Sequence, residues 1–207
     1  MSRRVFAVIS VATALTLAGC AEGQQAPSPT TASGSQSAAA QTVTQEQWRA
    51  QLDAGNLDAL VELLAEEGAA QWVDVQGSEG STALLDAATA GNAQAVDAFL
   101  DAGADPAQQS HAGFPVRSAI HIAAANGDVP TLEVILAHGV DVNQLDGGGG
   151  HALLWAAYKG QAEAVQFLLE QGADVGLVDG TGMNAAERAA DAGFADVAAQ
   201  IEAFGAS

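Results

Sequence analysis

Residues 151–174, HALLWAAYKGQAEAVQFLLEQGAD, contain the pattern that decides the fold of this chain. The pair Ala156-Ala157 comes shortly before Gly160, and the pair Leu168-Leu169 comes shortly before Gly172. In both halves the apolar residues recur at helical spacing, and glycine ends a helix readily because it adopts the left-handed conformation. The stretch therefore predicts two helices joined by a tight turn, with small residues on the first helix and large aliphatic residues on the second.

This two-helix unit returns along the chain at a nearly fixed period. The glycines equivalent to Gly160 lie 36, 33 and 33 residues apart, and each follows a pair of alanines: Gly91, Gly127, Gly160 and Gly193. A second series of glycines follows the second helix of each unit: Gly103, Gly139 and Gly172. A repeated period of this length predicts a stack of units in which each unit contacts only its neighbours. Such a stack presents a long surface and usually has no catalytic pocket.

Longer segments of these units are also alike: residues 80–88 read GSTALLDAA, residues 139–143 read GVDVN, and residues 165–169 read VQFLL. These segments resemble the ankyrin repeat. Only His121 keeps the histidine of the family pattern, and alanine replaces its proline in every unit: Ala83, Ala119, Ala152 and Ala185. The resemblance implies an all-α solenoid of stacked helix-turn-helix units, with short hairpin loops, called fingers, between them.

The resemblance also implies a single repeat domain at residues 44–207. Gly55 lies 36 residues before Gly91, which indicates a degenerate unit at the start of the stack. Trp48 is expected to cover the open end there, because the terminal units of such arrays differ from the internal ones. The predicted parts are a divergent cap (44–79), three repeats (80–112, 113–148 and 149–181) and a C-terminal cap (182–207).

The first 19 residues have the features of an export signal. Two arginines precede an apolar run at residues 5–17, which is too short to cross a bilayer of about 30 Å as a helix. The run ends in residues 17–20, LAGC, which resemble the lipobox of bacterial lipoproteins. This resemblance implies cleavage before Cys20 and a diacylglyceryl group on its sulfur. An ordinary secretory signal with a chance cysteine is the alternative, and the general secretory and twin-arginine routes both stay open.

Residues 20–43 are expected to join the lipid to the repeat domain. After Cys20 they consist largely of alanine, glutamine, serine, threonine, proline and glycine, with a single charge at Glu22. A segment of this composition cannot bury a core, so we predict a disordered linker. We expect an exported protein that is lipid-anchored to a bacterial membrane, either the outer membrane facing the periplasm or the outer face of the plasma membrane. Cys20 is the single cysteine, which excludes disulfides within the chain.

The chain is strongly acidic. Its formal net charge is −19, and removal of residues 1–19 takes away two arginines and no acid, which gives −21. Nucleic-acid binding needs a cationic surface and is therefore excluded, and the lipid is the only contact expected with a membrane. The acidity suits solubility outside the cytoplasm, or steering toward basic partners.

The sequence predicts no catalytic residue, no cofactor and no metal. It lacks a nucleophile elbow, a zinc-protease motif, a phosphate loop with its lysine and a dinucleotide fingerprint. Residues 147–150, GGGG, precede a helix as a phosphate-binding loop does, but they lack a basic partner and are interpreted as a flexible turn. A metal site needs converging ligands, whereas the repeat geometry places the histidines in different units: His111, His121, His138 and His151. Of these, His121 is expected to tie a loop to its helix, and His138 to bind the last carbonyl groups of a helix.

The family resemblance implies where a partner binds. Ankyrin repeats grip their partners with the finger tips and with the variable residues between the alanine pair and the glycine. In this chain the candidates at the variable positions are Thr89, Asn126, Tyr158, Lys159 and Asp191. Tyr158 is the single tyrosine and is a candidate anchor, because an aromatic ring with a polar tip suits a binding groove. A surface tyrosine without a role is the alternative.

Two further features bear on the binding surface. Trp155 precedes an alanine pair and is expected to pack in the core. The segment between Gly103 and Gly127 is three residues longer than its counterparts, and the extra length falls in residues 110–117. We expect a longer finger there that carries Phe114 and Arg117 to a partner, with a tolerated insertion as the alternative.

Together these observations predict an exported, membrane-anchored scaffold. We expect it to bind a partner protein of the cell envelope non-covalently, through its concave groove and its finger loops. The sequence does not name the partner. The alternative function is that of an accessory factor of the cell envelope that handles a small molecule or a cation on its acidic surface. An enzyme is not expected.

Overall fold

The computed structural model describes residues 42–110 and 117–206. Within these ranges the chain forms ten α-helices and one short 3-10 helix, Ala69–Trp72, and the only strand-like pairing is an isolated antiparallel bridge between Val178 and Asn184. The predicted all-α class is therefore confirmed. The signal, Cys20, the linker before residue 42, His111 and Phe114 lie outside the described residues, and the predictions about them stay predictions.

The helices are short, and none of those described is both long and apolar enough to cross a membrane. Their bounds are α1 (Gln45–Asp53), α2 (Leu57–Leu63), α3 (Ala83–Ala90), α4 (Ala93–Asp101), α5 (Ala119–Asn126), α6 (Val129–Ala137), α7 (Ala152–Tyr158), α8 (Ala162–Glu170), α9 (Ala185–Asp191) and α10 (Ala195–Gly205).

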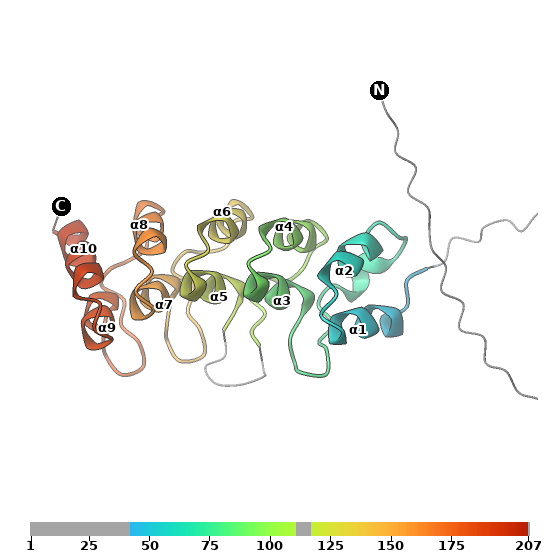
Figure 1. Cartoon of the computed structure of the whole chain (residues 1–207), viewed down its shortest axis with the longest axis horizontal. Coiled ribbons are helices and arrows are strands. Elements are labelled where there is room, and N and C mark those ends of the chain that lie inside the picture. Colours follow the sequence, from blue (N-terminus) through green and yellow to red (C-terminus); the bar gives the residue numbers. More distant parts are fainter. Residues whose placement is uncertain (1–41, 111–116, 207) are drawn as a thin grey trace, which may run out of the picture. The chain divides into compact units, whose positions relative to one another are not determined.

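From α3 onward the helices form two rows (Figure 1). The first row consists of α3, α5, α7 and α9, and the second row consists of α4, α6, α8 and α10. One helix of each row makes a unit, and the loops between units project beyond the first row as hairpins, which is the arrangement that the resemblance implied. At the N-terminal end of the stack α2 packs against α3 and α4.

The core is a continuous apolar spine between the two rows. The alanine pairs at residues 87–88, 123–124 and 156–157 have no exposed surface, and their small size lets the first-row helices approach one another closely. Each large side chain that is fully buried contributes about 1.5–3 kcal/mol, so the stack is stabilised by burial that neighbouring units share. Both rows supply these large side chains: Leu84, Leu85, Ile120 and Leu153 in the first row, and Val96, Phe99, Leu132, Ile135, Val165, Leu168 and Ile201 in the second.

Trp48 on α1 covers the N-terminal end of this spine. Its side chain is fully buried, and its ring meets Phe99 edge to face, with the ring centroids 6.3 Å apart and the planes at 74°. Such an edge-to-face pair adds about 0.5–1.5 kcal/mol beyond the burial of its area. The divergent first unit thus has an aromatic core residue at the position where the next three units have Leu84, Ile120 and Leu153.

The glycine turn between the two helices of a unit is also a contact between units. Gly127 has φ 73° and Gly160 has φ 70°, so both lie in the left-handed region that ends a helix. A residue of the next unit lies over each turn: a Cβ on Gly127 would lie 2.6 Å from Gln161, and a Cβ on Gly160 would lie 2.4 Å from Phe194. At Gly160 glycine is therefore favoured for space as well as for backbone conformation, whereas the flexible Gln161 side chain over Gly127 can move aside.

Candidate functional site

A cleft of about 490 Å³ opens among the units at the C-terminal end of the stack. Its walls come from α7, from α9 and from the two loops that precede these helices, residues 138–151 and 171–184. Arg117, which lies shortly before α5, joins the lining. Three kinds of side chain give the cleft its chemistry: one aspartate from each loop, two aromatic residues of α7, and three cations.

Asp146 builds the first of these loops around its carboxylate. Oδ1 accepts the backbone N–H groups of Gly148 at 2.8 Å and Gly150 at 2.7 Å, and the backbone N–H of Asp146 donates to the Gly150 carbonyl at 2.7 Å. A Cβ on Gly150 would lie 2.8 Å from the Asp146 carboxylate and 2.9 Å from the Trp155 indole nitrogen. The predicted turn at residues 147–150 is present, and a buried carboxylate ties this glycine run into a closed structure.

Trp155 forms a wall of the cleft. Its indole Nε1–H donates to Asp146 Oδ2 at 2.7 Å, and the Arg117 guanidinium lies over the indole, 4.8 Å from the ring centroid. Tyr158 meets the same ring edge-on, with the centroids 6.1 Å apart. The expectation that Trp155 packs in the core was wrong. The residue is half-buried and its N–H has an acceptor in the loop, whereas the indole N–H of Trp48 has no partner in the core.

The next unit repeats this arrangement with different chemistry. Asp179 lies 33 residues after Asp146, and Arg188 lies 33 residues after Trp155. Nε of Arg188 donates to Asp179 Oδ2 at 2.6 Å and a terminal nitrogen pairs with the same oxygen, while the Thr181 hydroxyl donates to Oδ1 at 2.7 Å. Burial alone raises the pKa of Asp179, but the hydrogen bonds from Thr181 and Arg188 outweigh burial and hold that pKa well below its ordinary value.

Three of the predicted partner-binding residues meet at this cleft. Tyr158 has 41% of its surface exposed, and Nζ of Lys159 lies 5.2 Å from the centroid of the tyrosine ring. Arg117 lies over the ring of Trp155, the other member of the aromatic pair. The structure thus brings together residues that the sequence places in two different units, while their part in binding stays a prediction.

The other predicted residues lie outside the cleft. Nδ2 of Asn126 donates to the backbone carbonyl of Thr89 at 3.4 Å, which joins the ends of α5 and α3. The Thr89 hydroxyl donates to the Leu85 carbonyl at 2.8 Å, and both Thr89 and Asn126 are exposed. Asp191 is the exposed last residue of α9 and does not line the cleft. These residues therefore extend the first-row surface on either side of the cleft.

Two histidines are buried within the stack. Nε2–H of His121 donates to the Gln144 carbonyl at 2.9 Å and its Nδ1 accepts the Ser118 hydroxyl at 2.8 Å, which ties α5 to the following loop as the resemblance implied. Nδ1 of His151 accepts the backbone N–H of Leu154 and so caps α7. Burial lowers the pKa of both imidazoles, and the backbone carbonyls that face them offset only part of that effect. Both rings are neutral at pH 7.

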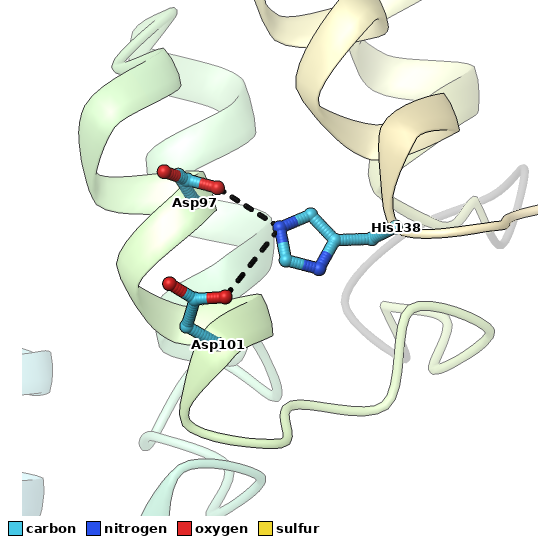
Figure 2. Close-up of side chains that lie close together, drawn as sticks. All are labelled: Asp97, Asp101 and His138. Atoms are coloured by element: carbon cyan, nitrogen blue, oxygen red, sulfur yellow. Dashed lines mark hydrogen bonds and ion pairs between the residues drawn. The ribbon is translucent and has the colours of Figure 1, made fainter.

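His138 makes a different contact, between units of the second row. Its Nε2 lies 2.9 Å from Asp97 and 3.9 Å from Asp101, and Figure 2 shows the ring reaching from the end of α6 to both carboxylates on α4. The ring was expected to bind the last carbonyl groups of α6. Its partners are instead the carboxylates of the preceding unit, which attract an imidazole more strongly than a carbonyl does.

These three residues are also a possible set of metal ligands within the described ranges. Their ligand atoms all lie within 4.8 Å of one another, and all three residues are exposed. The prediction of no metal site considered the histidines alone. It overlooked that two aspartates one turn apart on a helix can converge with a histidine of the next unit.

Sequence reasoning missed the residues that shape the cleft walls: Asp146, Trp155, Asp179 and Arg188. A signal for them was present, because the 33-residue period relates Asp146 to Asp179 and Trp155 to Arg188. In each pair the loop aspartate precedes its helical partner by 9 residues. The period, applied to polar residues as well as to glycines and alanines, shows that the two pairs are equivalent, so that either contact points to the other.

Comparison with known proteins agrees with the observed fold. A family model described as ankyrin repeats in three copies matches residues 116–201, and a model of the single ankyrin repeat matches residues 79–111. Together the two matches cover more than half of the chain, and the chain therefore belongs to the ankyrin-repeat family. This fold generally serves as a non-catalytic scaffold that binds other proteins.

Among curated proteins, a bovine protein is similar over a shorter stretch. The inactive serine/threonine-protein kinase TEX14 of Bos taurus is 36% identical over 85 residues, which make up 41% of this chain and 6% of that protein. The present chain thus spans a small fraction of the relative's length, and the similarity does not extend to the rest of that protein.

Proposed function

We propose that the protein is a scaffold that binds a partner protein of the bacterial envelope in its concave groove, and that a lipid on Cys20 holds it at the membrane. The cleft beside α7 is the observation that carries the binding proposal. There the exposed ring of Tyr158 lies next to Lys159. Arg117 lies nearby, over the ring of Trp155. Tyrosine, tryptophan and arginine are the residues that most often dominate the energy of a protein interface.

The cleft is held in shape by its own hydrogen bonds, which supports binding. Asp146 fixes Trp155, and Asp179 fixes Arg188, so these side chains lose little conformational freedom when a partner arrives. Both carboxylates already accept several donors, and no histidine is among the described residues that line the cleft. Carboxylates that are already held as acceptors suit recognition better than catalysis.

Photocrosslinking in the intact envelope tests the groove. A photoreactive phenylalanine analogue replaces Tyr158 in one variant, and in the control variant it replaces Gln94, an exposed residue of α4 on the second row. We expect position 158 to give a discrete adduct whose partner is identified by mass spectrometry, and position 94 to give none. The groove proposal fails if position 158 yields no adduct, or yields the same adducts as position 94.

Membrane anchoring is tested by fractionation. Cys20→Ser removes the sulfur that would carry the lipid, and Ser28→Ala in the same linker is the control. We expect the wild type and the control to sediment with membranes and the Cys20→Ser protein to be released. Retention of Cys20→Ser at the membrane would contradict the lipid anchor and leave the scaffold proposal untouched.

One observation favours the alternative function, cation handling. Asp97, Asp101 and His138 offer two carboxylates and an imidazole, which are donors that suit a transition metal such as zinc. Against this function, the three residues are exposed and already contact one another. Calorimetry with Zn²⁺ separates the two functions: micromolar binding that disappears in His138→Ala would favour cation handling, whereas the scaffold function requires no such binding.

A further inference from the structure

The cleft concentrates the positive charge of a very acidic protein. The described ranges contain four basic residues, and only Arg49, on α1, lies away from the cleft. The other three line it: Arg117, Lys159 and Arg188. Of the 25 acidic residues in the chain, two line the cleft. The cleft is therefore locally cationic although the formal net charge of the chain is −19.

The acids of the cleft are engaged, while two of its cations make no ion pair with a residue that the structure describes. Asp146 accepts three donors, and Asp179 pairs with Arg188. Within residues 42–110 and 117–206 no carboxylate lies at ion-pair distance from Arg117 or Lys159. Both cations instead face aromatic rings, which place them at the surface of an apolar wall. The free positive charge and the apolar wall thus occupy the same cleft.

We propose that the cleft binds a short segment of the partner protein in which a glutamate or aspartate side chain lies next to an apolar side chain. The carboxylate pairs with Arg117 and Lys159, and the apolar neighbour packs on Trp155 and Tyr158. The volume of about 490 Å³ lies in the range of pockets that enclose one small ligand, and two adjacent side chains are of that size. A longer acidic run does not fit, because the surface outside the cleft is itself acidic and repels it.

This inference rests on the proposed scaffold function, and a peptide titration of the full mature chain tests it. The probe is the peptide Ac-Gly-Phe-Glu-Gly-NH2, compared with peptides in which glutamine or lysine replaces the glutamate. The Trp155 indole N–H provides the readout in ¹H–¹⁵N NMR spectra, and Trp155→Phe assigns its signal among those of the three tryptophans. We expect a saturable shift with the glutamate peptide, with a Kd of about 1 mM or lower. The glutamine peptide should bind about tenfold more weakly, and the lysine peptide should leave the signal unchanged.

Two variants that have the same net charge show whether the glutamate peptide binds in the cleft. Lys159→Gln removes a cation of the cleft, whereas Arg49→Gln removes the cation of α1. We expect Lys159→Gln to weaken glutamate-peptide binding about fivefold, and Arg49→Gln to leave it unchanged. Equal weakening by both variants, equal binding of the glutamine or lysine peptide, or no shift with the glutamate peptide overturns the inference. A specific adduct at position 158 would still support the scaffold in each of these cases, so the two failures are distinguishable.

Discussion

A carboxylate that leaves water stays charged only where other donors replace its hydration. Asp146 meets this requirement with two backbone N–H groups and an indole, and Asp179 meets it with Thr181 and an arginine. Each aspartate also holds the residue 9 positions further on, so the turn of a finger and the wall of the cleft form one hydrogen-bonded structure. A change at the turn is therefore expected to act on the binding surface.

Replacement of Asp146 tests this coupling. Asp146→Ala leaves three donors without an acceptor, and we expect a loss of about 2–3 kcal/mol in the free energy of unfolding, measured with urea at pH 7. Asp146→Asn keeps an oxygen for the two backbone donors and loses mainly the indole bond, so a loss of about 1 kcal/mol is expected. Combined with Trp155→Phe, Asp146→Asn should cost less than the sum of both single changes, because both remove the same bond. Full additivity would contradict the coupling.

The buried histidines make the stability depend on pH. Their pKa values lie below the ordinary 6.5 in the folded protein, so the unfolded chain binds more protons once the pH falls below that value. The contribution of these two histidines to the free energy of unfolding is complete above about pH 7. It is lost as the pH falls through their pKa values in the folded protein. We expect the urea midpoint to be flat from about pH 8 to 7 and to fall from about pH 6.5 to 5.

Substitutions at a buried and at an exposed histidine test whether the buried histidines cause the loss of stability in acid. His121→Gln removes a buried titrating ring and keeps an amide for the same hydrogen bonds, so the fall of the midpoint with pH should become shallower. His138→Gln changes an exposed residue in the same unit and is the control. A pH profile that His121→Gln leaves unchanged would show that other groups cause the acid destabilisation.

At the residue scale, sequence patterns identified exposed residues better than they identified the half-buried Trp155. Tyr158 and Lys159 are exposed and were found because they occupy variable positions of the repeat. Arg117 is half-buried and was found because it lies in an insertion. Trp155 was wrongly predicted to lie in the core, because an apolar pattern takes account of its ring and not of its N–H, which needs an acceptor. Whether such a residue turns inward or outward depends on an acceptor in a loop, which helical periodicity does not specify.

At the scale of the elements, glycine sets where each helix ends and how closely the next unit approaches. The sequence predicted the first effect from the spacing of Gly91, Gly127, Gly160 and Gly193. The second effect became visible only with the neighbouring unit in place, since Phe194 lies over Gly160 and Gln161 lies over Gly127. The contact of the two fingers beside the cleft, from the Gly180 N–H to the Gly148 carbonyl at 3.0 Å, is likewise a property of two units together.

Two alanine substitutions separate these effects. Gly160→Ala and Gly193→Ala both place a side chain at positive φ, 70° and 91°, which costs about 1–2 kcal/mol. At Gly193 no atom lies within 4 Å of the added Cβ, whereas at Gly160 the Phe194 ring lies 2.4 Å away. We expect Gly193→Ala to cost about 1 kcal/mol and Gly160→Ala about 2–4 kcal/mol in urea unfolding. Gly160→Ala/Phe194→Ala should recover part of the difference, and equal costs for the two single variants would contradict the packing argument.

At the scale of the whole molecule, the stack gathers its cations from three units into one cleft and leaves the remaining surface acidic. Arg117, Lys159 and Arg188 occupy different positions within their units, so the repeat period does not relate them and the sequence does not show that they meet. The period did predict the order of helices and the shared spine, because those depend on apolar spacing alone. The charge pattern is therefore a product of the three-dimensional stacking.

The same charge distribution makes the stack repel itself. The formal net charge is −19, and exposed acids recur on neighbouring second-row helices, such as Glu133 on α6 and Glu163 on α8. Unfolding separates these charges, so self-repulsion lowers stability at low ionic strength. Salt screens the repulsion, since the Debye length falls from about 30 Å at 0.01 M to about 10 Å at 0.1 M.

We therefore expect the thermal unfolding midpoint to rise by a few degrees as NaCl increases from about 0.01 M to 0.3 M, with most of the rise below about 0.1 M. Calorimetry of the full chain measures this rise. The double variant Glu133→Gln/Glu163→Gln removes two of the repelling charges and should show a higher midpoint at low salt and a smaller rise with NaCl. A midpoint that falls with salt would mean that attractive pairs such as Arg188 with Asp179 outweigh the repulsion, because salt weakens those pairs as well.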